Sequence, residues 1–327
     1  MHRLLRGLAA AAAASTLALA LVPAGASQAA PSAPSRVLEI KPAKLDRGPD
    51  AQVPRMSGRT VVDGDRRVQV EGRRPVLLGR SGSAYVVVSR IDGRWTTQRV
   101  APGRPARTLL RGAFPESLLL SDDGAHLVYN QFTTRRKTVV DVRSARTGKL
   151  VDGTVFTGYV DVLGMDGGRL VLGGDDIGTR TWNVPAGASR RISPLRGYDV
   201  DFAGDRLAVY TGDPYEGGCT RVLRLSRPGT VLWRSCDERV DSFSPQGRRM
   251  VTVGILADGL GPNTLWERAT RGRLFARYEV AGWFGGVQWE NDSDFVVEAA
   301  GRKQMALVRC SGGVCDRASA LRPTPSY

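Results

Sequence analysis

Histidine, lysine and the motifs of common enzymes are scarce in this chain of 327 residues. There are only two histidines, and lysine supplies only five of the 47 basic residues, so nearly all of the positive charge is arginine. The sequence contains no His-Glu-x-x-His motif, no Gly-x-Ser-x-Gly motif and no phosphate-binding loop. These absences exclude the zinc peptidases, serine hydrolases and P-loop nucleotidases that carry such motifs.

Long apolar runs are missing beyond the N-terminus. Arg3 and Arg6 precede an apolar stretch of alanine and leucine at residues 7–22, and small residues follow. This order is typical of a secretory signal peptide at residues 1–29, cleaved after Ala26 or Ala29. A retained membrane anchor is the alternative, but the run is shorter than the roughly 20 residues that a spanning helix needs. We therefore expect a secreted, extracellular protein without stable insertion in a membrane.

The chain has only four cysteines, and they form two local pairs. Cys310 and Cys315 flank a Gly-Gly turn, one step beyond the closing pair of a hairpin, where opposite Cα atoms are about 4.5 Å apart. Cys219 and Cys236 are symmetric about a turn at residues 227–230. Both spacings suit disulfides, which persist in oxidising compartments. The alternative is a zinc site made by all four thiolates, which would require the two hairpins to meet.

A turn followed by an apolar strand recurs about every forty residues. The third residues after these turns are spaced 42, 43, 37, 43 and 45 residues apart: Tyr85, Leu127, Leu170, Leu207, Met250 and Phe295. Each unit contains four short strands with glycine-rich turns and no amphipathic helix, which is typical of a β-propeller blade. A pair of β-sandwiches is the alternative architecture, but it would not require a constant period.

One further hairpin at residues 58–70 precedes these units, and its equivalent residue, Val61, lies only 24 residues before Tyr85. We therefore predict an all-β fold, a propeller of seven blades with an incomplete first blade, and keep six blades as the alternative. The propeller should cover residues 53–320. A linker is expected at residues 30–52 and a tail at residues 321–327.

Two turns, Ser121-Asp-Asp-Gly124 and Ser244-Pro-Gln-Gly247, together with the strands that follow them, resemble the repeats of secreted bacterial WD40-like and TolB-like propellers. The resemblance covers roughly residues 53–318. The Gly-His and Trp-Asp pairs typical of WD40 repeats are absent from the sequence. What the resemblance implies is a scaffold for interaction more often than an enzyme, and it identifies no catalytic residue.

Aspartates at equivalent positions of the repeat are candidates for a site in the central channel. Asp161 and Asp241 each lie nine residues before the equivalent apolar residue of their unit, and Asp199 and Asp201 belong to the unit between them. Carboxylate oxygens are ligands of Ca²⁺, so these side chains are the candidates for this ion, and no other cofactor is expected. The alternative is that they bond to backbone amides of the next blade. His126 is expected to be structural.

The loops between the second and third strands differ most between units and should lie on one face with the connections between blades. Binding residues concentrate on loops held by a rigid scaffold, and Trp, Tyr and Arg most often anchor contacts. The candidate contact residues are Arg135, Arg136, Trp182, Tyr215, Trp283 and Phe284. The alternative is that the loops are merely solvated and that the Trp side chains pack between blades.

These features favour a non-catalytic binding scaffold, expected to be a monomer, for a protein, a glycan or an anionic cell-envelope polymer. Loss of Arg3 and Arg6 with the signal peptide lowers the net charge from +15 to +13. The arginines are spread over every unit, which argues against nucleic acid and fits an anionic polymer, with association to the cell wall. The alternative function is an extracellular hydrolase or lyase that uses carboxylates facing the channel.

Overall fold

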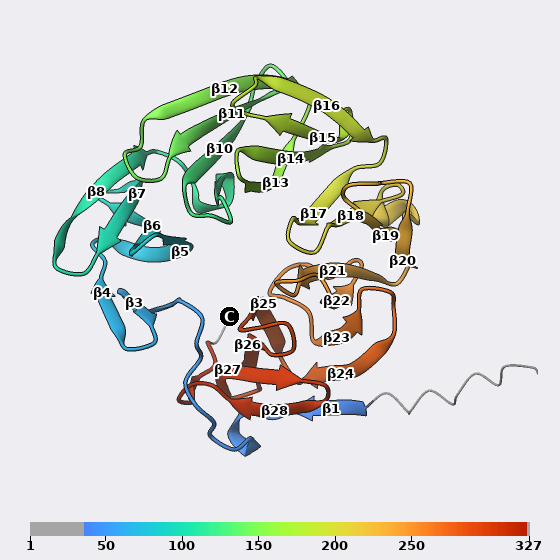
Figure 1. The fold of residues 1–327 in the computed structure, drawn as a ribbon. Coiled ribbons are helices and arrows are strands. Elements are labelled where there is room, and N and C mark those ends of the chain that lie inside the picture. The colour runs from blue at the N-terminus through green and yellow to red at the C-terminus, as the bar shows by residue number, and fades with distance from the viewer. Residues whose placement is uncertain (1–35, 326–327) are drawn as a thin grey trace, which may run out of the picture. The chain divides into compact units, whose positions relative to one another are not determined.

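The computed structural model describes residues 36–325, so the predicted signal peptide lies outside the described residues. Within this range the chain forms 29 strands, β1–β29, and three short 3-10 helices, η1–η3. The strands form seven separate sheets arranged around a common axis, as Figure 1 shows. The predicted β-propeller of seven blades is therefore confirmed. None of the helices in residues 36–325 has the length and hydrophobicity to span a membrane.

The first blade has three strands and the others have four or more. The first four blades are formed by β2 (Arg55–Ser57), β3 (Thr60–Asp63) and β4 (Arg66–Gln69); β5 (Arg73–Ser81), β6 (Ala84–Ile91), β7 (Arg94–Ala101) and β8 (Arg104–Arg111); β9 (Leu118–Leu120), β10 (His126–Thr133), β11 (Lys137–Ser144) and β12 (Leu150–Thr157); and β13 (Asp161–Asp166), β14 (Arg169–Gly174), β15 (Gly178–Asn183) and β16 (Ala188–Ser193).

The remaining blades follow in chain order. They are formed by β17 (Gly197–Asp201), β18 (Arg206–Tyr210), β19 (Thr220–Arg224) and β20 (Val231–Ser235); β21 (Glu238–Phe243), β22 (Arg249–Gly254), β23 (Thr264–Ala269) and β24 (Leu274–Val280); and β25 (Trp283–Trp289), β26 (Phe295–Ala300), β27 (Gln304–Ser311) and β28 (Val314–Arg317), with β29 (Arg322–Pro323) beside β27. The 3-10 helices are η1 (Pro42–Lys44), η2 (Pro115–Ser117) and η3 (Pro214–Glu216).

The apolar repeat predicted from the sequence marks the core of each blade. The six repeat residues lie on the second strands of blades two to seven and are almost completely buried: Tyr85, Leu127, Leu170, Leu207, Met250 and Phe295. The turns that precede them also match in detail. Ser121 N and Ser244 N each donate to a backbone oxygen across the turn, to His126 and Arg249, at 2.9 Å. Their hydroxyl oxygens accept the amides of the same two residues.

The segment expected as a linker at residues 30–52 contains strand β1 (Arg36–Ile40). This strand pairs in parallel with β24 at the outer edge of the sixth blade, as Figure 1 also shows. The chain then follows the outer edge of β28, where Gly48 N and Ala51 N donate to the backbone oxygens of Arg317 and Ala318 at 3.0 Å. We call residues 36–54 the strap, because they cross two blades before the first blade begins.

One arginine of the seventh blade fixes the strap. Arg309 Nε lies 2.6 Å from Glu290 Oε2, and Arg309 Nη1 lies 3.2 Å from Asp316 Oδ1. The same guanidinium donates to the backbone oxygens of Pro49 and Asp50 at 3.2–3.3 Å. Charged hydrogen bonds of this kind are stronger than neutral ones, so the strap is held by polar contacts as well as by strand pairing.

The strap should contribute to the stability of the whole ring, and Ile40→Ala tests this. Ile40 is 1% exposed and packs in the core of the sixth and seventh blades, so truncation should lower the free energy of unfolding by about 2–5 kcal/mol. The matched control is Val37→Ala on the same strand, where the side chain is 59% exposed and the change should stay within about 0.5 kcal/mol. Equal effects in urea titrations would contradict the observed pairing of β1.

Candidate functional site

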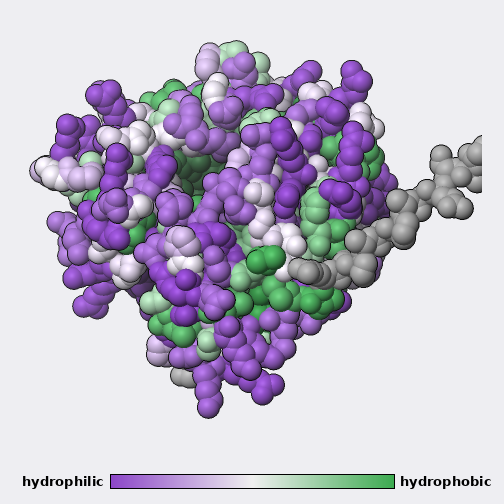
Figure 2. Space-filling model, turned by 60° about the horizontal axis from the view of Figure 1, so that its bottom comes forward, coloured by the Kyte–Doolittle hydropathy of each residue, from purple (hydrophilic) through white to green (hydrophobic). Residues whose placement is uncertain are grey.

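One face of the propeller carries the loops between second and third strands together with the connections between blades, because neighbouring strands of each blade are antiparallel. We call it the loop face. Large hydrophobic side chains that are about half exposed or more stand on it: Phe114, Phe132, Tyr159, Tyr215, Leu256 and Leu260. Other exposed large hydrophobic side chains lie away from this face: Val37, Val76, Leu150, Val151, Val155, Val231 and Val314. Figure 2 shows a mostly hydrophilic surface with hydrophobic areas between the polar side chains. Contiguous exposed apolar groups mark interaction sites, and the loop face has such groups beside a hollow.

A hollow of about 700 Å³ opens on the loop face between the fourth, fifth and sixth blades. We call it the tyrosine hollow, and its walls are formed by Asp175, Pro194, Leu195, Arg196, Tyr210, Thr211, Gly212, Asp213, Pro214, Tyr215, Arg239, Ile255, Leu256 and Ala257. The ring of Tyr210 is fixed by stacking on Tyr198, with ring centres 4.1 Å apart. Tyr215 is 70% exposed at the edge of the hollow.

The local sequence Asp213-Pro-Tyr-Glu-Gly217 explains how Tyr215 is placed. Pro214 begins the short helix η3, and Asp213 caps it by accepting the amide of Tyr215 at 2.9 Å. Gly217 ends the turn with φ +84°, a conformation that favours glycine. The hydroxyl of Tyr215 then donates to Asp258 Oδ2 at 3.2 Å, which joins the loops of the fifth and sixth blades.

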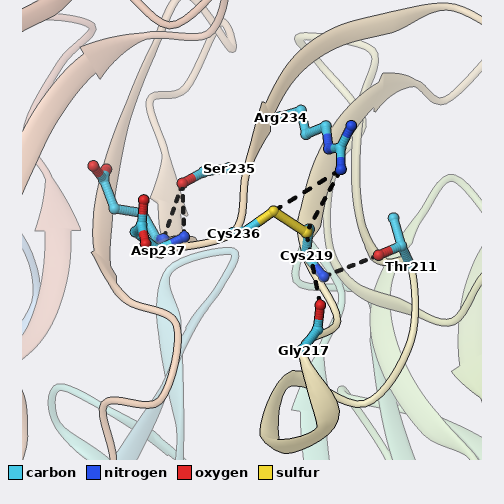
Figure 3. The surroundings of a disulfide bond; sticks show 8 residues. Thr211, Gly217, Cys219, Arg234, Ser235, Cys236 and Asp237 are labelled. Carbon is cyan, nitrogen blue, oxygen red and sulfur yellow. Dashed lines mark hydrogen bonds between the residues drawn. A yellow bond between two sulfur atoms is a disulfide. The ribbon is translucent and has the colours of Figure 1, made fainter.

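A disulfide closes the base of this loop. Cys219 and Cys236 are bonded with their Cα atoms 4.1 Å apart, and Figure 3 shows the bond between the loop and the connection to the sixth blade. Cys219 N donates to Thr211 Oγ1 at 2.9 Å, and Arg234 Nη2 lies 3.9–4.0 Å from the two sulfur atoms. Loop and connection are thereby held together beside the tyrosine hollow.

Both predicted disulfides are confirmed, because Cys310 and Cys315 are bonded as well, across the tight turn between β27 and β28. No cysteine remains free, so the alternative of a zinc site made by the four thiolates is excluded. The second bond lies on the face opposite to the loop face. Only Cys219–Cys236 therefore bears on the tyrosine hollow.

The two arginines in the wall of the hollow already have partners. Arg196 Nη2 lies 3.0 Å from Asp161 Oδ2, and its Nη1 lies 3.2 Å from Asp175 Oδ2. Arg239 Nη2 donates to the backbone oxygen of Ala257 at 3.1 Å. Asp161, a candidate metal ligand from the sequence, is thus an ion-pair partner that orients Arg196.

The other channel aspartates lie close enough to affect one another. Desolvation, with the charges of Asp241, Asp201 and Asp122 nearby, raises the pKa of Asp199 to about 8. Burial raises the pKa of Asp201 and Asp241 as well, and that of Asp122 to about 6. No group of three or more His, Cys, Asp or Glu side chains within residues 36–325 has the geometry to hold a metal ion.

The predicted contact residues divide into two groups. Arg135, Arg136 and Tyr215 are exposed on loops of the loop face, and Trp283 is partly buried at the start of β25. Trp182 and Phe284, in contrast, are only 2% and 1% exposed. Both pack in hydrophobic cores and cannot contact a ligand at the surface, so this part of the prediction is corrected. Sequence reasoning missed Tyr210 and Leu256, which only the fold brings together with Tyr215.

The sequence matches no known protein family and no curated protein. In the fold, the propeller domain of the Trilobed protease from Pyrococcus furiosus is similar, with 13% identity and a TM-score of 0.56 over 85% of this chain and 99% of that chain. An acylaminoacyl peptidase from Pyrococcus horikoshii gives 12% identity and a TM-score of 0.58 over 80% of this chain and 47% of that chain. A chain of the mitotic checkpoint complex gives 13% identity and a TM-score of 0.51 over 72% of this chain and 76% of that chain.

At these identities the similarity shows the β-propeller fold alone. The matched part of this chain spans about half the length of the peptidase chain. The similar structures include parts of a protease and a peptidase as well as a chain of a protein assembly. They therefore do not distinguish a catalytic role from a binding role.

The raised pKa of Asp199 predicts that stability falls as pH rises. The native state holds a proton between about pH 4, the usual pKa of an unfolded aspartate, and about pH 8, so unfolding becomes easier through this window. Asp199→Asn should remove part of this dependence and raise the melting temperature at pH 9 by roughly 2 °C or more. Glu116→Gln, at an exposed carboxylate, is the control. Identical pH profiles for Asp199→Asn and the native protein would refute this account.

Removal of the Cys219–Cys236 bond should loosen the loop that carries Tyr215. The double variant Cys219→Ser/Cys236→Ser should lose about 3 kcal/mol of stability, and Cys310→Ser/Cys315→Ser about 2 kcal/mol, because the second bond closes a shorter loop. Hydrogen exchange at residues 211–219 should accelerate in the first variant only. Unchanged exchange there would show that hydrogen bonds alone hold the loop.

Proposed function

We propose that this chain is a secreted, non-catalytic β-propeller that binds a partner protein in the tyrosine hollow. The observation that carries the proposal is the hollow itself, in which Tyr210, Tyr215 and Leu256 surround about 700 Å³ on a face with further exposed apolar side chains. Buried aromatic anchors that fill pockets dominate the energetics of protein interfaces. The two disulfides fit a location outside the cytosol.

Rigidity of the frame supports the same proposal. The hollow is bounded by loops whose ends are fixed by strands, by the Cys219–Cys236 bond and by the hydrogen bond from Tyr215 to Asp258. A partner would therefore meet a surface that is already formed, and little conformational entropy would be lost on binding. The channel carboxylates support the catalytic alternative less well, because Asp161 forms an ion pair with Arg196.

Site-specific photo-crosslinking tests the proposal. Tyr215 is replaced by a photoreactive phenylalanine derivative, and the protein is expressed in the cells that produce it naturally. Irradiation should then give one discrete adduct with one partner. The same residue at Val231, which is 51% exposed on the outer strand of the same blade, should not. An excess of unmodified protein should suppress the adduct, whereas an excess of the Leu256→Arg variant should not. Adducts of equal yield at both positions would refute the hollow as the binding site.

A further inference from the structure

The rim of the tyrosine hollow is acidic, although the whole chain has a net charge of +15. The loops and connections around it are residues 175–177, 194–196, 211–219, 236–237 and 255–263, and Arg196 is their only basic residue. They carry six acidic residues, all exposed: Asp175, Asp176, Asp213, Glu216, Asp237 and Asp258. Arg196 is paired with Asp161 and Asp175. Three further guanidinium groups reach these loops from neighbouring strands, those of Arg191, Arg234 and Arg239. Six carboxylates thus face four arginines, and a small excess of negative charge remains.

Positive charge collects elsewhere on the same face. The turn between β10 and β11 carries Arg135 and Arg136, and the loop between β26 and β27 carries Arg302 and Lys303. Exposed charges act on a ligand over about 8 Å at physiological salt. A ligand in the hollow is therefore affected by the acidic rim and hardly by the net charge of the protein.

Two carboxylates of the rim each use only one of their two oxygens in hydrogen bonds. Asp213 Oδ1 accepts the amide of Tyr215, and Asp258 Oδ2 accepts its hydroxyl. The second oxygen of each accepts no hydrogen bond within residues 36–325. Free carboxylate oxygens beside an exposed aromatic ring fit an arginine, because a guanidinium binds carboxylates through paired hydrogen bonds and stacks on aromatic faces.

The apolar part of the hollow continues beyond its rim. A second hollow of about 710 Å³ shares Ile255, Leu256 and Ala257 with it and is also lined by Asp237 and Asp258. Together they offer an apolar floor between acidic edges. An extended segment with basic side chains fits such a surface, because Arg and Lys bury their aliphatic stems while the charged ends remain at the edge.

We propose that the tyrosine hollow binds an extended, arginine-containing segment of the partner protein. This inference rests on the proposed function and specifies the chemistry of the partner. The ring of Tyr215 stacks on the guanidinium group of the bound arginine. Asp213 and Asp258 accept hydrogen bonds from this guanidinium. Leu256 contacts an apolar side chain next to the arginine in the bound segment. An anionic polymer is disfavoured at this site, since it would meet the acidic rim.

Two matched peptides test the inference with the full chain. One is a labelled 12-residue peptide that alternates Arg with Leu and Gly, and the other carries Glu in place of every Arg. Net charge alone predicts that the basic protein prefers the Glu peptide. The acidic rim predicts the opposite, so fluorescence anisotropy should show at least about tenfold tighter binding of the Arg peptide, which corresponds to 1.4 kcal/mol.

Charge-removing variants locate the contact. Asp213→Asn/Asp258→Asn keeps an acceptor for both groups of Tyr215 and should weaken binding of the Arg peptide by about fivefold to tenfold. The control Asp65→Asn/Glu71→Gln removes the same charge at exposed positions of the first blade and should leave binding unchanged. Circular dichroism and melting temperature verify that the variants fold.

Each outcome decides between the two proposals. Preference for the Glu peptide, lack of preference at millimolar peptide, or insensitivity to Asp213→Asn/Asp258→Asn would overturn the inference. If crosslinking at position 215 then captures a neutral or acidic segment, the proposed function stands and only the ligand chemistry is wrong. If neither peptide binds and position 215 gives no specific adduct, both proposals fall.

Discussion

Attachment of the beginning of the propeller to its last blades is the constraint on which the other features of this structure depend. A blade of a propeller buries its two faces only against its neighbours, so an open seam would expose the apolar faces of two sheets. In this chain an early segment, which leads directly into the first blade, is fixed on the outer edges of the sixth and seventh blades. Ile40 enters the core shared by the sixth and seventh blades, and Arg309 holds the backbone of Pro49 and Asp50. Residues separated by some 260 positions are thereby fixed together.

Buried polar groups also connect neighbouring blades. In the sixth blade, Glu267 is completely buried, and its carboxylate accepts hydrogen bonds from Tyr278 and from Gly312 N in the seventh blade, beside Arg249. A buried carboxylate is tolerated only with such partners, because an unpaired charge in the interior costs several kcal/mol. These contacts join the sixth blade to the seventh, in addition to the apolar packing between them.

A rigid frame lets short loops carry local charge that differs from the average of the chain. Excess arginine sets the net charge, yet the loops of the fourth to sixth blades are acidic and lie around an aromatic hollow. The tyrosines in this hollow are fixed from below by stacking of Tyr210 on Tyr198 and from the side by the Cys219–Cys236 bond. Binding chemistry is thus decided by where loops meet and not by overall composition.

The sequence by itself determined the features that repeat or are local: the seven blades, the buried residues at intervals of about forty, and the two disulfides across hairpins. Contacts between distant segments have no such signal, so the parallel pairing of β1 with β24 could not be foreseen. Residue type also failed to tell core from surface at Trp182 and Phe284, because aromatic rings suit both environments. Only the tertiary structure decided the tyrosine hollow and its acidic rim, since loops from three blades must meet before either exists.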